Sequence, residues 1–365
     1  MTTSIAEPVA NPSHSDLKQR WQALREAQPN LRIRNAANQL GVSELALVLL
    51  REDDNVQALK PAFSSLLEAM DSVGEVMILS RNDAVVHEVT GTFKEFRTAG
   101  SGTMGLALGA IDVRVFFGQW HHGFRVREEV RSGLRESLQF FDAHGQAIQK
   151  IYRTDATDTE AWNALVSDFL ADKSTEPLDL LPARKPLERV DPGTIDGESL
   201  RQDWASLKDV HHFNALLKRH KVDRLTALEL IGPTYATRLG SAGSVGSSPL
   251  DLLFEQVRES QCSLMIFVGN PGIVQIYSGP IQKVVPTGEW LNILDPKFNL
   301  HVNIPSITDW WCARRPSTDG IVTSVEGYSA TGELVLTVFG ERKPGQVENE
   351  GWREECRKLE RALCP

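Results

Sequence analysis

Two adjacent histidines, His211 and His212, stand out among the residues that could carry chemistry. Neutral imidazole is the most common metal ligand among protein side chains. The pair lies in the segment DVHHFNALLKRH, whose apolar spacing predicts a helix. Neighbouring side chains of a regular helix point about 100° apart, so both rings cannot bind one metal ion. The segment therefore predicts one ligand with a spare neighbour, or two ordinary histidines on a helix surface.

Four arginines form a second group of candidates, because the planar guanidinium group binds carboxylates through paired hydrogen bonds. Arg114 lies in the strand-like segment IDVRVFF, on the same predicted face as Phe116, where it could meet a ligand. Arg224 begins a predicted helix, Arg315 follows an aromatic pair, and Arg342 ends a predicted strand. Taken singly, each of these arginines is equally compatible with an ordinary surface charge.

A further histidine, His87, lies in the segment AVVHEVTG. The alternation of this segment predicts a β-strand with His87 on one of its faces. Two interpretations remain open at this position, a second metal ligand or a histidine that is hydrogen-bonded within a sheet.

The composition restricts the class of protein. The chain has 365 residues, a formal net charge of -9, 41% hydrophobic residues and 24% charged residues, which is typical of a globular protein in solution. The negative charge disfavours general binding to nucleic acid. The sequence contains no apolar run long enough to cross a bilayer and no secretory signal pattern at its start. We therefore expect a cytoplasmic protein without membrane insertion.

The chain contains an internal duplication. Residues 77–91 (MILSRNDAVVHEVTG) match residues 265–279 (MIFVGNPGIVQIYSG) at a constant offset of 188 positions. A repeat of this length predicts two domain-sized copies. The segment of the first copy that corresponds to the histidine pair, AQPNLRIRNAAN, has no histidine. This difference indicates a site in the second copy only.

The duplication divides the chain into four predicted parts. These parts are a disordered lead (1–16), an N-terminal repeat (17–172), a proline-rich and charged linker (173–198) and a C-terminal repeat (199–365). Within each repeat, helical spacing comes first and strand-like alternation follows. We therefore predict an α+β fold with two similar halves, each with helices packed on a large antiparallel β-sheet.

One segment resembles a DNA-binding motif. Residues 33–50, IRNAANQLGVSELALVLL, have the pattern of a helix-turn-helix. The second helix would read ELALVLLRED, which is apolar and acidic rather than basic. Packing of two helices explains the segment better than recognition of nucleic acid.

Several separated segments resemble, in order and over nearly the whole chain, the bacterial haemin-transport and haemin-degrading family typified by HemS, ChuS and PhuS. They are LKDVHHFNALLKRH, GAIDVRVFFGQW, MIFVGNPGIVQIYSGPIQKV, WLNILDPKFNLHV and VFGER. The resemblance implies two similar halves, with haem b held between a helix and the sheet of the C-terminal half. The histidine pair is most similar to the PhuS branch, which carries a further histidine where this chain has Asn214.

The resemblance also implies roles for individual residues. His211 follows Asp-Val and corresponds to the axial iron ligand, with His212 as the alternative ligand. Arg114 corresponds to the family's distal arginine, and His87 to a second haem site attributed to some members. The positions implied to contact the haem edge or its propionates are Arg224, Arg315, Arg342 and Phe339, the last in place of a tyrosine.

Three functions are compatible with these residues. The first is a haem carrier for iron acquisition, which would receive haem from an inner-membrane importer and deliver it to a haem oxygenase. The second is an enzyme that opens the porphyrin ring with a reductant and dioxygen or peroxide, with Arg114 as its catalytic residue. The third is a haem-responsive regulator that binds nucleic acid. Carrier and enzyme need the same pocket, so the sequence does not decide between them.

Overall fold

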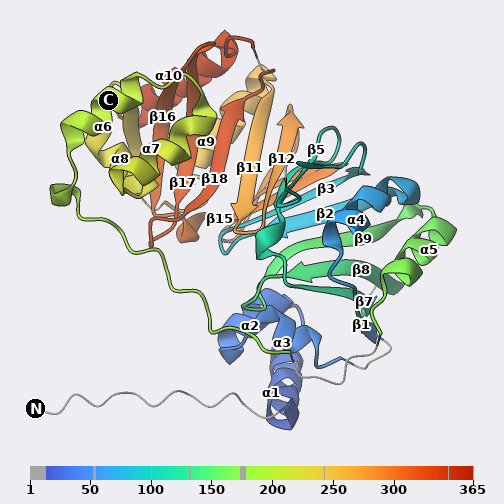
Figure 1. Ribbon diagram of the computed structural model, residues 1–365. Coiled ribbons are helices and arrows are strands. Elements are labelled where there is room, and N and C mark those ends of the chain that lie inside the picture. The colour runs from blue at the N-terminus through green and yellow to red at the C-terminus, as the bar shows by residue number, and fades with distance from the viewer. Residues whose placement is uncertain are drawn as a thin grey trace, which may run out of the picture.

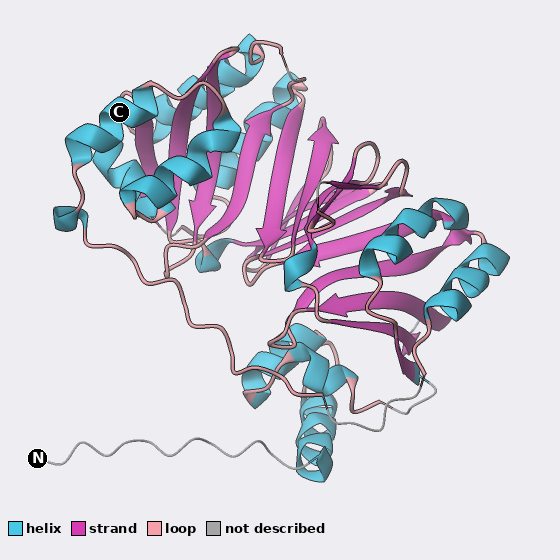
Figure 2. Cartoon of the chain, viewed as in Figure 1, coloured by secondary structure: helices cyan, strands magenta, loops and turns pink. Residues whose placement is uncertain are grey.

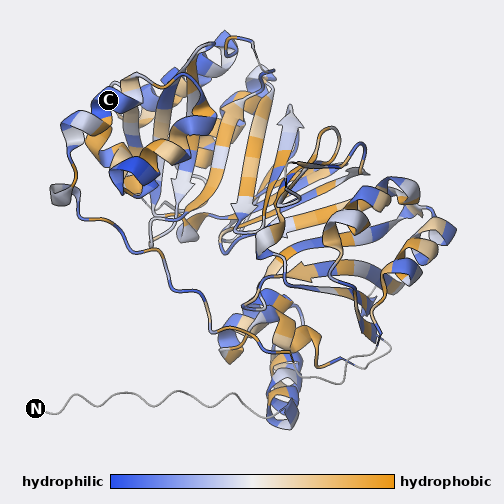
Figure 3. Cartoon of the chain, viewed as in Figure 1, coloured by the Kyte–Doolittle hydropathy of each residue, from blue (hydrophilic) through white to orange (hydrophobic). Residues whose placement is uncertain are grey.

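The chain forms two antiparallel sheets of nine strands each, with helices packed against both (Figures 1 and 2). The computed structural model describes residues 14–51, 55–99, 101–130, 133–172, 178–241, 243–343 and 345–364. Apolar residues gather along the strands of both sheets (Figure 3), and their burial provides the main driving force for folding. The predicted α+β class with large antiparallel sheets is confirmed.

The two halves contain the same series of strands. Those of the N-terminal half are β1 (Val56–Ala58), β2 (Gly74–Arg81), β3 (Val85–Thr92), β4 (Arg97–Ala99), β5 (Met104–Ala107), β6 (Asp112–Phe116), β7 (His122–Val130), β8 (Gly133–Phe141) and β9 (Ala147–Thr157). Those of the C-terminal half are β10 (Ala236–Ser241), β11 (Leu264–Asn270), β12 (Ile273–Gly279), β13 (Val284–Thr287), β14 (Trp290–Asp295), β15 (Phe298–Asn303), β16 (Asp309–Ser317), β17 (Gly320–Tyr328) and β18 (Leu334–Gly340).

The helices also recur in the same order. In the first half they are α1 (His14–Ala27), α2 (Ile33–Leu40), α3 (Glu44–Val48), α4 (Phe63–Ala69) and α5 (Thr159–Phe169). In the second half they are α6 (Gly197–Ala205), the 3₁₀ turn η5 (Val210–His212), α7 (Phe213–His220), α8 (Arg224–Ile231), α9 (Pro249–Ser260) and α10 (Glu350–Leu363). Among the described residues, no helix is long and apolar enough to cross a membrane.

Each sheet takes its last three strands from the opposite half of the chain. The first sheet has the order β1-β7-β8-β9-β2-β3-β15-β14-β13, and the second has the order β10-β16-β17-β18-β11-β12-β6-β5-β4. The two orders become identical when each strand is replaced by its counterpart in the other repeat. The exchange means that the spatial units do not coincide with the sequence repeats 17–172 and 199–365. The strand with Arg114, β6, therefore belongs to the second sheet.

Two equivalent asparagines join the halves at the centre of this exchange. The side-chain nitrogen of Asn82 donates hydrogen bonds to the carbonyl oxygens of Gly269 (3.1 Å) and Val335 (2.8 Å). The side-chain nitrogen of Asn270 donates in turn to the carbonyl oxygens of Arg81 (3.0 Å) and Ile148 (2.8 Å). Each asparagine therefore satisfies backbone groups of the other half, which makes the interface reciprocal.

Local signals explain where several elements begin and turn. Ser43 and Asp223 accept hydrogen bonds from the backbone of α3 and α8 and cap them. Turns at residues 143–146 and 330–333 connect β8 to β9 and β17 to β18. One part of the prediction was incomplete, because each half ends in a helix, α5 or α10, and not in strands.

The predicted lead and linker are only partly described. Residues 1–13 of the lead lie outside the described residues, and α1 already begins at His14. Residues 173–177 of the linker also lie outside them, and residues 178–191 have no helix or strand. The helix-turn-helix resemblance corresponds to α2 and α3, but Glu44, Leu45, Leu47 and Val48 of α3 are buried. This helix therefore offers no face to a DNA groove.

We predict that Asn82→Ala lowers the free energy of unfolding by about 2 kcal/mol, because it leaves two carbonyl groups of the other half without a partner. Urea unfolding measures this change. Asn163→Ala, at an exposed position of α5, is the matched control and should change stability by less than about 0.5 kcal/mol. Equal stabilities of the two variants would contradict the reciprocal interface.

Candidate functional site

A large cleft of about 2030 Å³ lies over one face of the second sheet. Strands β5, β6, β11, β12 and β18 form its floor, and η5 with the start of α7 forms a wall. Residues 183–186 of the linker and several residues of the N-terminal half line the remaining sides. Because β5 and β6 are exchanged strands, the floor is assembled from both halves of the chain.

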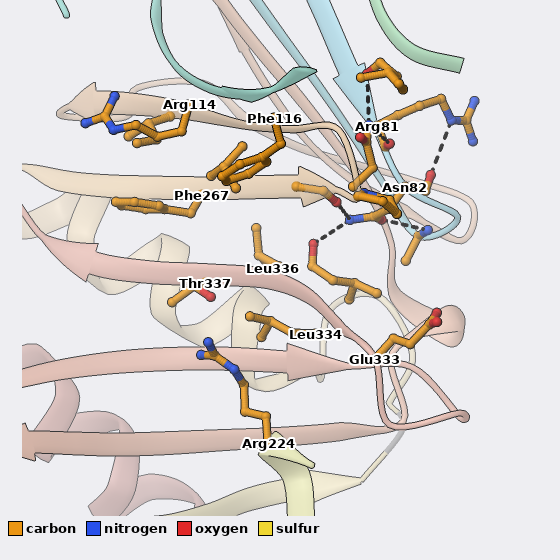
Figure 4. Close-up of a pocket in the computed structure, with 18 of the residues that line it drawn as sticks. Arg81, Asn82, Arg114, Phe116, Arg224, Phe267, Glu333, Leu334, Leu336 and Thr337 are labelled. Atoms are coloured by element: carbon orange, nitrogen blue, oxygen red, sulfur yellow. Dashed lines mark hydrogen bonds between the residues drawn. The ribbon is translucent and has the colours of Figure 1, made fainter. Parts of the chain in front are cut away.

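The floor of the cleft is apolar and aromatic. Phe116 and Phe267 project from neighbouring parts of the sheet, with Leu334 and Leu336 beside them (Figure 4). The ring of Phe339 packs edge-on against Phe267, with 5.1 Å between the ring centroids. Phe267 and Phe339 share a face because Phe267 pairs directly with Thr337, and residues two apart on a strand share a side. The result is a broad apolar surface suited to a flat apolar ligand.

His211 stands at the wall of the cleft, and Asp209 fixes its ring. Asp209 accepts hydrogen bonds from the backbone nitrogen of His211 (2.8 Å) and from its Nδ1 atom (2.7 Å). The side chain of His211 is 84% exposed. A carboxylate on Nδ1 selects the tautomer whose Nε2 atom carries the free lone pair. His211 therefore presents a ring nitrogen with a free lone pair at the wall of the cleft.

The other two candidate histidines, His212 and His87, occupy different environments. His212 is exposed and is not among the cleft-lining residues, so only one ring of the pair lines the cleft. His87 is fully buried in β3, with its ring 5.1 Å from that of Phe298. Burial lowers the pKa of His87 to about 3, so the ring is neutral and inaccessible. The prediction of a second haem ligand at His87 does not fit this position.

Arg114 lies on the floor of the cleft, as the alternation of IDVRVFF predicted (Figure 4). Its guanidinium donates to Asp112 and to the carbonyl oxygen of Val113 (3.1 Å). Its side chain is 32% exposed. Burial raises the pKa of the Asp112 carboxyl group, and the charge of Arg114 opposes that rise. Asp112 thus steadies an arginine that still faces the cleft.

The three candidate arginines of the C-terminal half differ in how free they are to contact a ligand. Arg224 lines the cleft with its side chain 25% exposed, and its nearest carboxylate contact is Glu326 at 3.7 Å. Arg342 also lines the cleft, its Nη1 atom makes no hydrogen bond to the described residues, and its ion pair with Asp319 is long at 4.0 Å. Both could receive a carboxylate.

Arg315 is in a different situation, because it is only 3% exposed. Its Nη1 atom donates to Glu326 (2.6 Å) and to Ser324 (2.9 Å). The side chain is already paired inside the protein, although part of it lines the cleft. Its Nε and Nη2 atoms have no hydrogen-bond partner among the described residues, so only one of the three guanidinium nitrogens of Arg315 is committed to the protein interior.

The carboxylate of Glu326 lies between Arg315 and Arg224 and forms an ion pair with each of them. Burial alone raises the pKa of its carboxyl group, but the charges of Arg315 and Arg224 and hydrogen bonds from Arg315 and Tyr328 lower it to about 2. The carboxylate is therefore ionised throughout the physiological range.

The cleft is positively charged although the chain is not. Its lining contains nine basic and five acidic side chains, whereas the whole chain carries a formal charge of -9. The basic ones are Arg34, Arg81, Arg114, Arg184, Lys185, Arg224, Arg315, Arg342 and Lys343. A cleft of this kind attracts an anionic ligand.

Sequence reasoning missed several residues of the site. The role of Asp209 could have been found from its place two residues before His211, at the start of a helical turn. Glu326 could have been noticed as a charge inside an apolar strand segment. Arg184 and Lys185 line the cleft from the linker, and no sequence pattern placed the linker there.

The haemin-degrading HemS.ChuX domain matches this chain twice, over residues 41–169 and residues 221–359. The chain belongs to this family. Hemin transport protein HmuS of Yersinia pestis is 36% identical over 346 residues, which cover 95% of this chain and 98% of HmuS. The predicted family and the duplicated fold are thereby confirmed.

Two solved structures share the whole fold. The heme-binding protein PhuS of Pseudomonas aeruginosa, in its holo form, is 41% identical, and the match covers 94% of this chain and 98% of PhuS with a TM-score of 0.87. The heme degrading enzyme ChuS of Escherichia coli O157:H7 is 34% identical, with 96% and 100% covered and a TM-score of 0.86. The two similar structures are thus a heme-binding protein and a heme degrading enzyme.

We predict that Glu326→Gln lowers the free energy of unfolding by about 3 kcal/mol at pH 7, because the folded pKa of about 2 lies below the ordinary value of 4.5. This stabilisation is complete above pH 4.5 and is lost as the pH falls toward 2. Urea unfolding between pH 7 and pH 3 should show the difference between the two proteins narrowing below pH 4.5. The exposed Glu333 provides the control, since Glu333→Gln should give no such pH-dependent difference.

Proposed function

We propose that this protein binds haem b in the cleft through His211 and serves as a cytoplasmic haem carrier in iron acquisition. It would receive haem that an inner-membrane importer has brought in and would deliver it to a haem oxygenase. The observation that carries the proposal is the oriented imidazole of His211 beside an apolar floor and two arginines, Arg224 and Arg342, whose nearest carboxylates lie 3.7 Å and 4.0 Å away. The similarity to heme-binding PhuS and to hemin transport protein HmuS supports it.

The residues of the cleft match the chemical parts of haem. Haem is a flat apolar disc with an iron atom at its centre and two carboxylates on one edge. His211 offers Nε2 to the iron, and the aromatic floor with Phe267 and Phe339 offers an apolar surface. Arg224 and Arg342 offer positive charge to carboxylates. Bound haem would supply an iron that takes an axial nitrogen ligand.

A carrier must bind its cargo firmly but reversibly. His211 meets this requirement because its side chain is 84% exposed and lies on a short 3₁₀ turn outside the sheet. Asp209 keeps the ring in the ligating tautomer while the wall of the cleft stays open to solvent. This combination suits the transfer of haem to another protein.

We predict that His211→Ala weakens haemin binding by about a hundredfold and shifts the Soret band, because the axial nitrogen is lost. His212→Ala is the matched control, since it removes a neighbouring histidine that does not line the cleft. Haemin titration followed by absorbance measures both affinity and ligation. If His212→Ala produced the change and His211→Ala did not, the assignment of the ligand would be wrong.

A second candidate function is degradation of the bound haem. The guanidinium of Arg114 favours it, because it reaches the cleft from the sheet whereas His211 comes from the helical wall. Arg114 would offer a hydrogen-bond donor to haem held in the cleft. The E. coli relative ChuS is described as a heme degrading enzyme and as a heme oxygenase.

We predict that the haem-loaded protein passes its haem to a haem oxygenase and that it keeps its Soret band when it is given a reductant, dioxygen and catalase alone. Absorbance spectra and an assay of released iron distinguish the two functions. Loss of the Soret band with release of iron, slowed by Arg114→Gln, would instead establish the enzyme. Catalase is needed because free peroxide destroys haem without any enzyme.

A further inference from the structure

The buried guanidinium of Arg315 has contacts that ligand binding does not explain. Its Nη1 atom is bound to Glu326 and Ser324, and the two side chains of the ion pair are 4% and 0% exposed. Burying two charges costs free energy that their mutual attraction only partly offsets. The net contribution of such a pair to stability is therefore small, and the pair can serve instead to hold a neighbouring group in position.

The guanidinium of Arg315 faces two aromatic rings, and the ring of Phe213 is the nearer of them. The guanidinium carbon of Arg315 lies 4.2 Å from the centroid of this ring, and that of Arg224 lies 4.8 Å from it. Both arginines are paired with Glu326. The ring of Trp204 closes a third side, with 4.9 Å between the two ring centroids. Phe213 is thus held by two cations and one aromatic ring.

Phe213 connects this cluster to the haem ligand. It is the first residue of α7 and also ends η5, where its backbone nitrogen donates to the carbonyl oxygen of Val210. His211 lies in that same short turn, two residues earlier. A displacement of the Phe213 ring would therefore move the turn and the imidazole with it.

We propose that Arg315 and Glu326 form a positioning pair, which fixes Phe213 on the sheet and thereby places His211 at the wall of the cleft. The inference rests on the proposed ligation of haem by His211. It assigns Arg315 to the support of the ligand helix and leaves Arg224 and Arg342 to meet the carboxylates of the haem.

The first repeat provides an internal comparison. Its helix α2 begins with Ile33 where α7 begins with Phe213. In the equivalent strands, Glu128 stands at the position of Arg315 and Gln139 at that of Glu326. The repeat without a counterpart of His211 thus lacks all three parts of the arrangement. The cluster accompanies His211 and is not a general feature of the fold.

The experiment is a haemin titration of Arg315→Gln, Glu326→Gln and Arg315→Lys, with the Soret band and affinity as readouts. The two glutamine variants should weaken binding by about tenfold and shift the Soret band toward that of His211→Ala. Arg315→Lys keeps the charge beside Glu326 and should retain the native spectrum. Glu326→Gln tests the pair from the side of the carboxylate, because it leaves Arg315 and Arg224 in place and removes the charge that both of them contact.

Arg125→Gln is the matched control for loss of stability. Arg125 forms another largely buried ion pair, at 2.8 Å with Glu136, and neither residue lines the cleft. This variant should unfold more easily than the native protein but keep the native haem spectrum. Should a glutamine variant at Arg315 or Glu326 fail to fold, the double variant Arg315→Met with Glu326→Gln removes both charges together and takes its place.

Two results would overturn the positioning role. One is a Glu326→Gln protein with native affinity and spectrum, together with an Arg315→Gln protein that binds weakly with an unchanged spectrum. Arg315 would then contact the ligand directly. The other is a native spectrum in the double variant. If the native protein and His211→Ala give the same titration, it is instead the proposed function that fails.

Discussion

The exchange of three strands between the halves is the constraint on which the rest of the structure depends. It is fixed where Asn82 and Asn270 donate to backbone carbonyl groups of the opposite half. A third side chain, Gln275, also donates across the interface, to the carbonyl oxygen of His87. Because these donors satisfy carbonyl groups that would otherwise be buried without partners, separating the two halves costs free energy. The cleft is a product of this exchange, since Arg114 reaches it on a strand of the other half.

The two repeats carry different residues at positions that line the cleft in the second repeat. At the position of Arg224 the first repeat has Glu44, and at the position of Thr337 it has Lys150. These two residues form a buried ion pair, in which the charge of Lys150 lowers the pKa of Glu44 against the opposing effect of burial. The pair closes a position that is open in the second repeat. One fold therefore supports a sealed face in one copy and a ligand-binding face in the other.

Periodicity was sufficient to predict the order of helices and strands in each half, the helix that begins at Arg224 and the residue types of the site. It could not predict the exchange of strands, because alternation assigns a face to each residue but does not name the neighbouring strand. Arg314 and Arg315 illustrate the same limit. They are adjacent on β16 and point to opposite faces, so that Arg314 pairs with Glu360 and Arg315 with Glu326. The sequence shows two arginines, and only the packing of α7 and α10 distinguishes them.

The electrostatics of the site follow from this difference between adjacent residues. Glu326 reduces the contribution of Arg315 to the positive field of the cleft, although this guanidinium still lines the cleft. Arg224 is also near Glu326, but at 3.7 Å and with 25% of its side chain exposed it can still attract an anion. Glu326 thus lies close to Arg315, which we propose supports His211. It lies farther from Arg224, which faces the cleft. Binding strength and ligand geometry are in this way set by different residues of a single charged cluster.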